Sequence, residues 1–274
     1  MGPSAAAGCA PPDWRQPIRP RARTILSSAA CLAACLVAAG TAGGAGKQSA
    51  LQVPGRVLAL GDFETGGLTQ WSIAARRRAS SIEVVRKPVR QGRYAARFEV
   101  RKGDNPIGFG DRAQIQIGTN ETEGQVRWYS WSTRLSPSFP RYGNWQVLAQ
   151  WHAKADGSPP VGFFAENDDL VLQVHRTGHP GQVLSTVDIW RGPLLRGQWR
   201  DIRMHVRWSG SDAKGWIELW IDGVRQTFDD GSVRRRIRTM LPGIGNYFAM
   251  GYYRQSGLSK PGVVFHDAFR MTTG

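Results

Sequence analysis

Cysteine is missing from most of this 274-residue chain. Its three cysteines, Cys9, Cys31 and Cys35, all lie near the N-terminus. From residue 36 onward the chain therefore has no disulfide bond and no thiolate ligand for a metal ion. That part must be stabilised by its hydrophobic core, and about 230 residues are enough to bury one.

Long apolar runs and the common catalytic motifs are also absent. The apolar stretch at residues 25–39 is shorter than the roughly 20 residues of a membrane-spanning helix, so we expect no membrane span in the mature chain. The sequence has no P-loop, dinucleotide fingerprint, H-E-x-x-H zinc motif or G-x-S-x-G elbow. It also has no recognisable nucleic-acid-binding module, so we expect no nucleic-acid partner.

The first 45 residues have the features of an export leader. Basic residues precede the apolar stretch, and the small residues T-A-G-G-A-G follow it. We predict a leader over 1–45, secretion of the protein, and one domain over 46–274. The segment L-A-A-C, residues 32–35, matches the acylation pattern of bacterial lipoproteins, so anchoring through Cys35 is the alternative to free secretion.

Acidic residues are few compared with basic ones. The chain has 36 Lys and Arg against 21 Asp and Glu, a formal net charge of +15. A basic surface concentrates polyanions, and both acidic polysaccharide and nucleic acid are polyanions. The clusters at 76–78 and 234–238 have a simpler explanation as solvated loops, so basic clusters do not identify the ligand.

Short alternating apolar segments, separated by turn residues, dominate the chain after the leader. This pattern predicts an all-β fold, a two-sheet antiparallel sandwich of the concanavalin A-like jelly-roll type. The candidate strands are 57–60, 81–85, 94–100, 112–118, 125–135, 146–152, 161–165, 170–175, 183–189, 199–208, 215–221, 246–254 and 263–271.

One hairpin illustrates the pattern. In R-D-I-R-M-H-V-R-W, residues 200–208, the apolar side chains alternate with Arg and His, which predicts one buried and one polar face. The next segment, W-I-E-L-W-I, ends at Asp222-Gly223, a dipeptide typical of tight hairpin turns.

Three strand segments bring chemically useful side chains onto shared faces. They are D-R-A-Q-I-Q-I (111–117), Q-W-H (150–152) and Y-F-A-M-G-Y-Y-R-Q (247–255). Side chains alternate with period two, so Gln150 shares a face with His152, and Arg112 shares one with Gln114. By the same alternation Trp151 faces away from His152, into the core.

These segments resemble the signature strands of jelly-roll polysaccharide lyases, namely the alginate lyases and the group of heparin lyase I and glucuronan lyase. Their patterns read approximately R-[ST]-E-[LV], Q-[IVW]-H and Y-F-K-x-G-[IVY]-Y, and they occur here in the same order. The similarity extends over most of residues 61–270. It implies a jelly-roll fold and a secreted enzyme that cleaves a uronate-containing polysaccharide by β-elimination.

The residue types suit that chemistry. Elimination removes the hydrogen on carbon 5 of a uronate, next to a carboxylate that the enzyme must neutralise. Arg112 supplies a positive fork and Gln150 an amide donor. His152 and Tyr253 are assigned jointly to taking this proton and protonating the leaving oxygen. No redox cofactor is required. A hydrolase would favour two opposed carboxylates, and the acidic cluster Glu166, Asp168 and Asp169 is more typical of a turn.

Departures from the family pattern affect substrate preference. Ala249 replaces a lysine and Gln114 replaces a glutamate that would orient Arg112. Further candidates for substrate contact are Gln114, Trp145, His175, Arg176 and Arg254. Glu64 and Asp267, near the first and last strands, resemble an acidic pair that binds structural calcium in some sandwiches, although calcium needs about 6–8 oxygen ligands.

We therefore predict a monomeric lyase acting on an anionic polysaccharide. Because no long basic insertion like that of heparin lyase I is evident, an unsulfated polyuronate is favoured over heparin. The alternative from another class is a noncatalytic carbohydrate-binding module, which would not need His152 and Tyr253 together.

Overall fold

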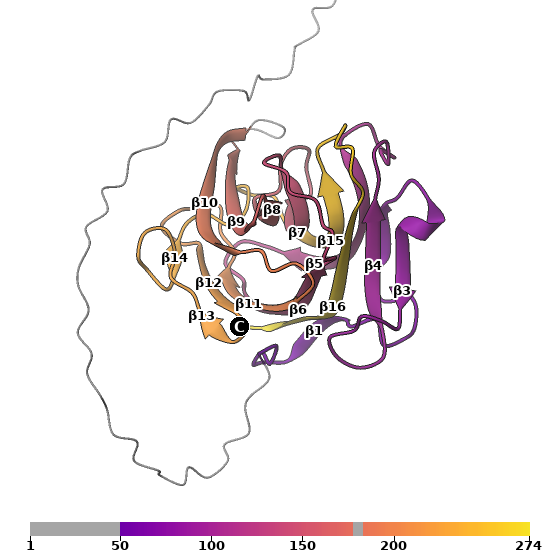
Figure 1. Ribbon diagram of the computed structural model, residues 1–274. Helices are drawn as coiled ribbons and strands as arrows, with labels where there is room; N and C mark the ends of the chain where they lie inside the picture. The colour runs from indigo at the N-terminus through magenta and orange to yellow at the C-terminus, as the bar shows by residue number, and fades with distance from the viewer. Residues whose placement is uncertain (1–49, 178–182) are drawn as a thin grey trace, which may run out of the picture. The chain divides into compact units, whose positions relative to one another are not determined.

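A computed structural model describes residues 50–177 and 183–274 of the chain. These residues form two antiparallel sheets and one short 3-10 helix, η1 (Ala79–Ser81), within a compact unit that extends over Lys47–Gly274 (Figure 1). The predicted leader and its Cys35 lie outside the described residues. Within the described ranges, no helix has the length and apolar character needed to cross a membrane.

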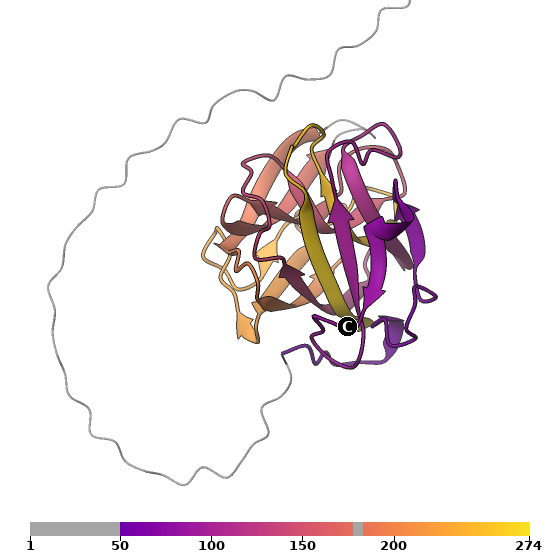
Figure 2. The same ribbon diagram turned by 45° about the vertical axis from the view of Figure 1, so that its right-hand side comes forward.

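Sheet A comprises nine strands of the described residues: β1 (Val57–Gly61), β3 (Ile82–Val85), β4 (Ala95–Val100), β6 (Val126–Leu135), β11 (Trp199–Arg207), β12 (Trp216–Ile221), β13 (Val224–Arg225), β14 (Arg235–Arg236) and β16 (Gly262–Thr273). Their order is β13-β12-β11-β6-β16-β4-β3, with β1 beside β16 and β14 beside β12. In Figure 2 the yellow β16 lies beside the purple β4, and the register pairs Val264 with Phe98.

Sheet B comprises seven strands of the described residues: β2 (Ser72–Ala75), β5 (Asp111–Glu121), β7 (Gln146–Ala153), β8 (Val161–Glu166), β9 (Asp169–Thr177), β10 (Val183–Pro193) and β15 (Asn246–Arg254). Their order is β10-β9-β8-β7-β15-β5-β2. The strand β15, late in the sequence, is thus inserted between β5 and β7. This crossover places all three signature segments on adjacent strands.

The core lies between the two sheets and is rich in aromatic rings. Trp151 of β7 is fully buried, as its alternation with His152 predicts, and its ring centroid lies 5.0 Å from that of Phe248. Trp131 of sheet A contacts the same two rings at 5.9 and 5.7 Å. Burying a large apolar side chain contributes about 1.5–3 kcal/mol, so this aromatic layer stabilises a domain that has no disulfide bond.

The predicted all-β jelly roll is confirmed. Each strand expected from the sequence is present, and the hairpin turn at Asp222-Gly223 has the positive φ angles (53° and 83°) that its dipeptide favours. Three strands were not predicted. β13 and β14 have two residues each, and the edge strand β2 buries only its last residue, so none of them shows an alternating pattern.

Candidate active site

The side chains of sheet B that point away from the core form one surface, which we call the open face. The strand register places six of its residues in a single row across six neighbouring strands: Gln116, Ala249, Gln150, Gly162, Gln173 and Asp188. Ala249 is small, so no long side chain separates Gln116 from Gln150. The open face therefore presents amide groups in line across the sheet.

Arg112 and Tyr253 form the cationic end of the open face. They are direct cross-strand partners on β5 and β15, and the guanidinium carbon lies 3.6 Å from the centre of the phenol ring. Arg112 Nη2 donates to the carbonyl of Phe109 at 2.7 Å, whereas its buried Nε has no acceptor. Burial lowers the pKa of Arg112, and among the described residues no carboxylate pairs with it. A half-buried cation without a counter-ion is a ready receptor for an anionic group.

Tyr253 is fixed by its neighbours. The ring of Trp145 meets it edge-on with centroids 4.7 Å apart, and Gly110 lies so close that a Cβ there would approach the Tyr253 ring to 2.4 Å. Burial raises the pKa of Tyr253, and the nearby charge of Arg112 opposes this shift. The phenol is therefore protonated at neutral pH, as a proton donor must be.

Two buried glutamines lie on either side of β15. Gln114 is the cross-strand partner of Gly251, and Gln150 is the partner of Ala249. Their side chains are 2% and 4% exposed, yet Gln114 Nε2 and Gln150 Oε1 have no hydrogen-bond partner in the described chain. Unsatisfied buried amides are costly, and a bound polar ligand would satisfy them. Gln114 therefore does not orient Arg112, which rests on Tyr253 instead.

His152 lies on the open face and is held by the last residue of β7 and by the loop that follows it. Its Nδ1 is 2.8 Å from the carbonyl oxygen of Ala153, and its Nε2 is 2.9 Å from that of Gly157. A neutral imidazole has one N–H, so only one of these contacts is then a hydrogen bond. Accepting a proton from substrate requires that one nitrogen leave its carbonyl.

Tyr247 is a site residue that the sequence reasoning did not select. It is the cross-strand partner of His152, and the two rings stack with centroids 5.7 Å apart. Burial raises the pKa of Tyr247, and the positive charge of Arg112 opposes this shift. The Tyr247 phenol is therefore near enough to Arg112 to interact with its charge. Tyr247, Ala249, Gly251 and Tyr253 are every second residue of β15. The alternation of side chains along a strand therefore predicts that Tyr247 shares a face with Tyr253.

A bulge in β15 fixes the position of Tyr253. The register with β7 shifts between Met250 and Tyr253, and Gly251 there has φ 141°. The carbonyl of Gly251 is 3.0 Å from Nε2 of His266, a fully buried residue of sheet A. Nδ1 of His266 lies 3.0 Å from Thr133 Oγ1, which itself accepts from Trp131 Nε1 at 3.1 Å.

This chain of contacts has one consistent direction. The Trp131 N–H is a donor only, so Thr133 accepts from it and turns its own hydrogen toward His266 Nδ1. His266 then carries its hydrogen on Nε2 and donates to Gly251. Burial lowers the pKa of His266 to about 4, so the imidazole is neutral at neutral pH and the chain stays intact. The core thus supplies a hydrogen-bond donor to the Gly251 carbonyl at the bulge.

Three predicted substrate contacts do not lie at the cationic end of the open face: His175, Arg176 and, as described below, Arg254. His175 is 9% exposed, packs against Phe164 and lies 2.7 Å from the Pro159 carbonyl through Nδ1. Burial lowers its pKa. Arg176 forms an ion pair with Asp212 at 2.7 Å.

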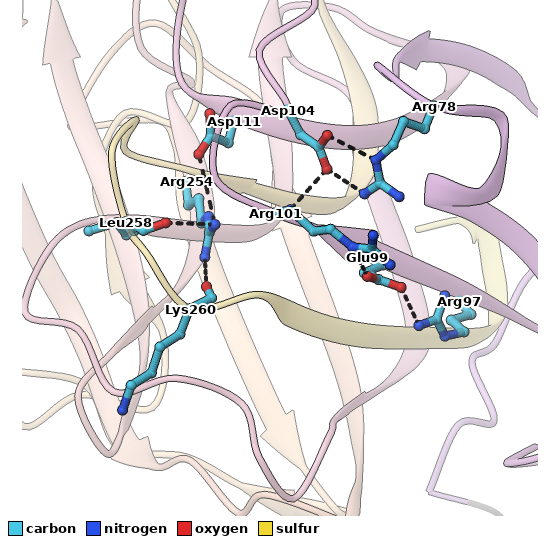
Figure 3. A network of polar contacts seen from close by, with 9 residues as sticks. All are labelled: Arg78, Arg97, Glu99, Arg101, Asp104, Asp111, Arg254, Leu258 and Lys260. Atoms are coloured by element: carbon cyan, nitrogen blue, oxygen red, sulfur yellow. Dashed lines mark hydrogen bonds and ion pairs between the residues drawn. The ribbon is translucent and has the colours of Figure 1, made fainter.

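The prediction for Arg254 is wrong. Its side chain is fully buried and donates to the carbonyls of Lys260 and Leu258, with Asp111 at 3.8 Å (Figure 3). A side chain without solvent exposure does not contact a polymer on the surface. Alternation explains the error, because Arg254 follows Tyr253 on β15 and therefore faces the interior.

The far end of the open face is acidic. Arg191 of β10 pairs with Glu166, Asp169 and Asp188 at 2.9, 3.0 and 2.6 Å. Gln173 donates to Glu166 and Asp188, each at 2.9 Å. Glu166 and Asp169 flank the β8–β9 turn, as the sequence indicated. Three carboxylates around one guanidinium leave this end negative, whereas the Arg112 end is positive.

The candidate calcium pair lies where β1 meets β16. Both carboxylates accept backbone N–H groups: Glu64 from Arg93 and Tyr94, and Asp267 from Arg90 and Gln91. The other oxygen of Asp267, Oδ1, is buried without a partner. Burial, with a contribution from the charge of Glu64, raises the pKa of Asp267 to about 6. A cation would satisfy this oxygen, so the pair fits part of a calcium site, although the described residues contain no cluster of three metal-binding side chains.

The open face thus brings together an arginine, amides, an imidazole and a phenol on one sheet of a jelly roll. A polysaccharide lyase family model matches residues 63–270, most of the chain. The chain therefore belongs to this family and is a polysaccharide lyase. A comparison with curated protein sequences gave no match.

Solved structures with a similar fold include two lyases. An endo-β-1,4-glucuronan lyase from the fungus Trichoderma reesei has 15% identity and a TM-score of 0.64, over 80% of this chain and 96% of that one. The alginate lyase A1-II′ has 13% identity and a TM-score of 0.50, over 72% of this chain and 85% of that one. At these identities the similarity establishes the fold.

Proposed function

We propose that this lyase cleaves an unsulfated uronate polymer by β-elimination at the Arg112 end of the open face. The observation that carries the proposal is the guanidinium of Arg112, which is held against Tyr253 and which no carboxylate of the described residues pairs with. It shares the open face with the buried amides of Gln114 and Gln150. Arg112, assisted by Gln150, accepts the substrate carboxylate. Neutralising that carboxylate lowers the cost of the enolate-like charge that develops when the hydrogen on carbon 5 leaves.

The two proton transfers are assigned to His152 and Tyr253. His152 takes the proton from carbon 5 once one of its nitrogens is released by its carbonyl partner. Tyr253, protonated because burial raises its pKa, donates to the glycosidic oxygen on carbon 4. The carbon–oxygen bond breaks, a double bond forms between carbons 4 and 5, and the leaving chain departs as an alcohol.

Glucuronan is the first substrate to test. The glucuronan lyase from Trichoderma reesei has a similar fold, with a TM-score of 0.64, and this similarity of fold supports the choice. The acidic end at Glu166 and Asp188 also opposes a densely sulfated polymer, because like charges would meet there. Heparin is therefore expected to be a poorer substrate than a polyuronate with one charge per sugar.

Three further properties belong to the same proposal. The protein is exported through residues 1–45, with a lipid anchor at Cys35 as the alternative, and it acts as a monomer. A calcium ion bound by Glu64 and Asp267 would be structural, because both carboxylates lie where β1 meets β16 and outside the open face. Elimination by Arg112, Gln150, His152 and Tyr253 needs no cofactor.

The test is the ultraviolet absorbance of the unsaturated uronate product. Purified protein without the leader is incubated separately with glucuronan, alginate, heparin and hyaluronan. The variants His152→Ala and Tyr253→Phe should abolish the signal, whereas Tyr94→Phe, a control at the residue before β4, should retain it. Binding without any unsaturated product, unchanged in the variants, would instead identify a noncatalytic binding protein.

A further inference from the structure

A second aromatic and cationic surface lies on sheet A, on the side turned away from the core. Ser130, Arg203, Trp220 and Arg225 are consecutive cross-strand partners on β6, β11, β12 and β13. The next row pairs Trp128 with His205 and His205 with Glu218. We name Trp128, Arg203, His205, Trp220 and Arg225 the outer Trp-Arg patch. It covers three interstrand spacings, roughly 14 Å, on the sheet opposite the one that carries the active site.

The patch is ordered by ring and cation contacts. Arg203 lies 4.6 Å from the centre of the Trp220 ring, and Arg225 lies 5.5 Å from it. His205 stacks on Trp128 with centroids 4.0 Å apart and an interplanar angle of 5°. Trp128 and Trp220 remain partly exposed. These contacts hold the cations and the indole edges in fixed positions before any ligand arrives.

The charge of the patch is not balanced. Glu218 is 4% exposed and pairs with His205 at 2.8 Å, with Arg234 at 3.2 Å and with Arg225. Arg203 is left without a carboxylate among the described residues. Its Nη1 donates to the Gln52 carbonyl at 3.1 Å, and its buried Nε has no acceptor.

Arg203 thus has the same features as Arg112 on the opposite sheet. Burial lowers the pKa of both guanidinium groups, each rests on an aromatic ring, and each has a buried Nε without a partner. A desolvated guanidinium with no counter-ion is costly unless it gains an anion. On the open face this pattern marks the carboxylate receptor of the proposed function.

We propose that the outer Trp-Arg patch is a second binding site for the acidic polysaccharide, separate from the catalytic face. Arg203 and Arg225 bind carboxylates of the polymer, and the exposed edges of Trp128 and Trp220 contact the apolar faces of its sugars. The choice of a polysaccharide rests on the proposed function, because the substrate is then already a uronate polymer. A long chain bound here keeps its other segments at high local concentration near the active site.

This arrangement predicts an effect that depends on chain length. The patch and the open face belong to different sheets, so a short oligosaccharide occupies one site at a time, whereas a long polymer can engage both. Removing the patch should therefore raise KM for the long polymer and leave kcat for a tetrasaccharide unchanged.

The test uses Arg203→Met/Arg225→Met, which keeps apolar stems against Trp220 and removes both charges. The matched control is Arg76→Met/Arg77→Met, which removes two exposed charges that lie outside the outer Trp-Arg patch. Affinity for long glucuronan and for long alginate is measured by affinity electrophoresis on chains that also carry Tyr253→Phe, so that substrate is not consumed. The patch variant should bind about five- to tenfold more weakly, with a smaller dependence on salt, than the control.

Kinetics on the catalytically intact background complete the test. With the patch variant, KM for the long polymer should rise by a similar factor, and the rate on a tetrasaccharide should stay within about twofold. Equal affinities in the patch and control variants would overturn the proposal. Equal loss of binding to duplex DNA would overturn the polysaccharide assignment and identify a general polyanion surface. Should no polymer be cleaved, the proposed function fails, while the binding comparison still decides on the patch.

Discussion

Replacing His266 should change how the stability of the domain depends on pH. His266 lies in the core and joins Thr133 of sheet A to the Gly251 carbonyl of sheet B. Its ring also meets Phe98 edge-on at 5.4 Å. The chosen perturbation is His266→Gln, because a glutamine amide can accept from Thr133 and donate to Gly251 but does not titrate.

The magnitude follows from the lowered pKa. The unfolded imidazole binds a proton below pH 6.5, whereas the folded one does so only near pH 4. Between these values the unfolded state holds more protons, so the stability that the neutral His266 provides is lost as pH falls through this window. At pH 4.5 the loss is on the order of 2 to 3 kcal/mol relative to pH 7.5. A domain is typically stable by only about 5–15 kcal/mol.

Asp267, the next residue, acts in the opposite direction. Its pKa is raised from 3.8 to about 6, so its carboxyl favours folding more as pH falls through that interval. The two effects largely cancel in the wild-type protein, and a pH series on that protein alone would conceal both. The informative quantity is therefore the difference between His266→Gln and the wild type at each pH.

Urea unfolding, followed by tryptophan fluorescence, provides this difference at pH 7.5, 6.0 and 4.5. The free energy of unfolding of His266→Gln, relative to that of the wild type, should rise by on the order of 2 to 3 kcal/mol between pH 7.5 and 4.5. As a control, Asp267→Asn should move in the opposite direction over the same interval. A constant difference between His266→Gln and the wild type would refute a neutral, buried imidazole.

Three further predictions concern the site and the terminal strands. Arg112→Met keeps an apolar side chain against Tyr253 but removes the positive charge. It should lower kcat/KM at least ~100-fold and leave the circular dichroism spectrum unchanged. A decrease in kcat/KM below threefold would argue against Arg112 as the carboxylate receptor. Gly251→Ala places a Cβ 2.3 Å from the Ala113 carbonyl oxygen. The free energy of unfolding, measured with urea, should therefore fall by ~2–4 kcal/mol. An unchanged urea midpoint would show that the bulge relaxes. Calcium should raise the Tm of the wild type and a chelator should lower it, whereas Asp267→Asn should show neither shift; equal shifts in both proteins would exclude Asp267 as a ligand.

The alternation of apolar and polar residues was sufficient to predict the sheets. Ile202, Met204 and Val206 are buried as their spacing requires, and the Asp222-Gly223 turn has the predicted geometry. This succeeds because a strand between two faces must repeat with period two, whatever its partners are. Two-residue strands such as β13 carry no such repeat, and only their pairing identifies them.

Alternation also separated the site residues from the core where it was applied consistently. It placed Trp151 inside and His152 outside, and both placements are correct. It would have excluded Arg254 and included Tyr247, since these lie at odd and even offsets from Tyr253. Arg254 is charged, yet its position on β15 faces the interior, where the carbonyls of residues 258 and 260 accept from it and Asp111 lies 3.8 Å away.

By itself, the sequence determined the class of fold, the faces of its strands and the set of side chains that could act on a uronate, because these depend on residue type and on local periodicity. Only the tertiary structure decided which of them meet. The insertion of β15 between β5 and β7 brings Tyr253 onto Arg112, and the bulge at Gly251 needs a histidine from the other sheet. The unpaired charge of Arg203 is equally a property of the fold, since it depends on which carboxylates the packing leaves out of reach.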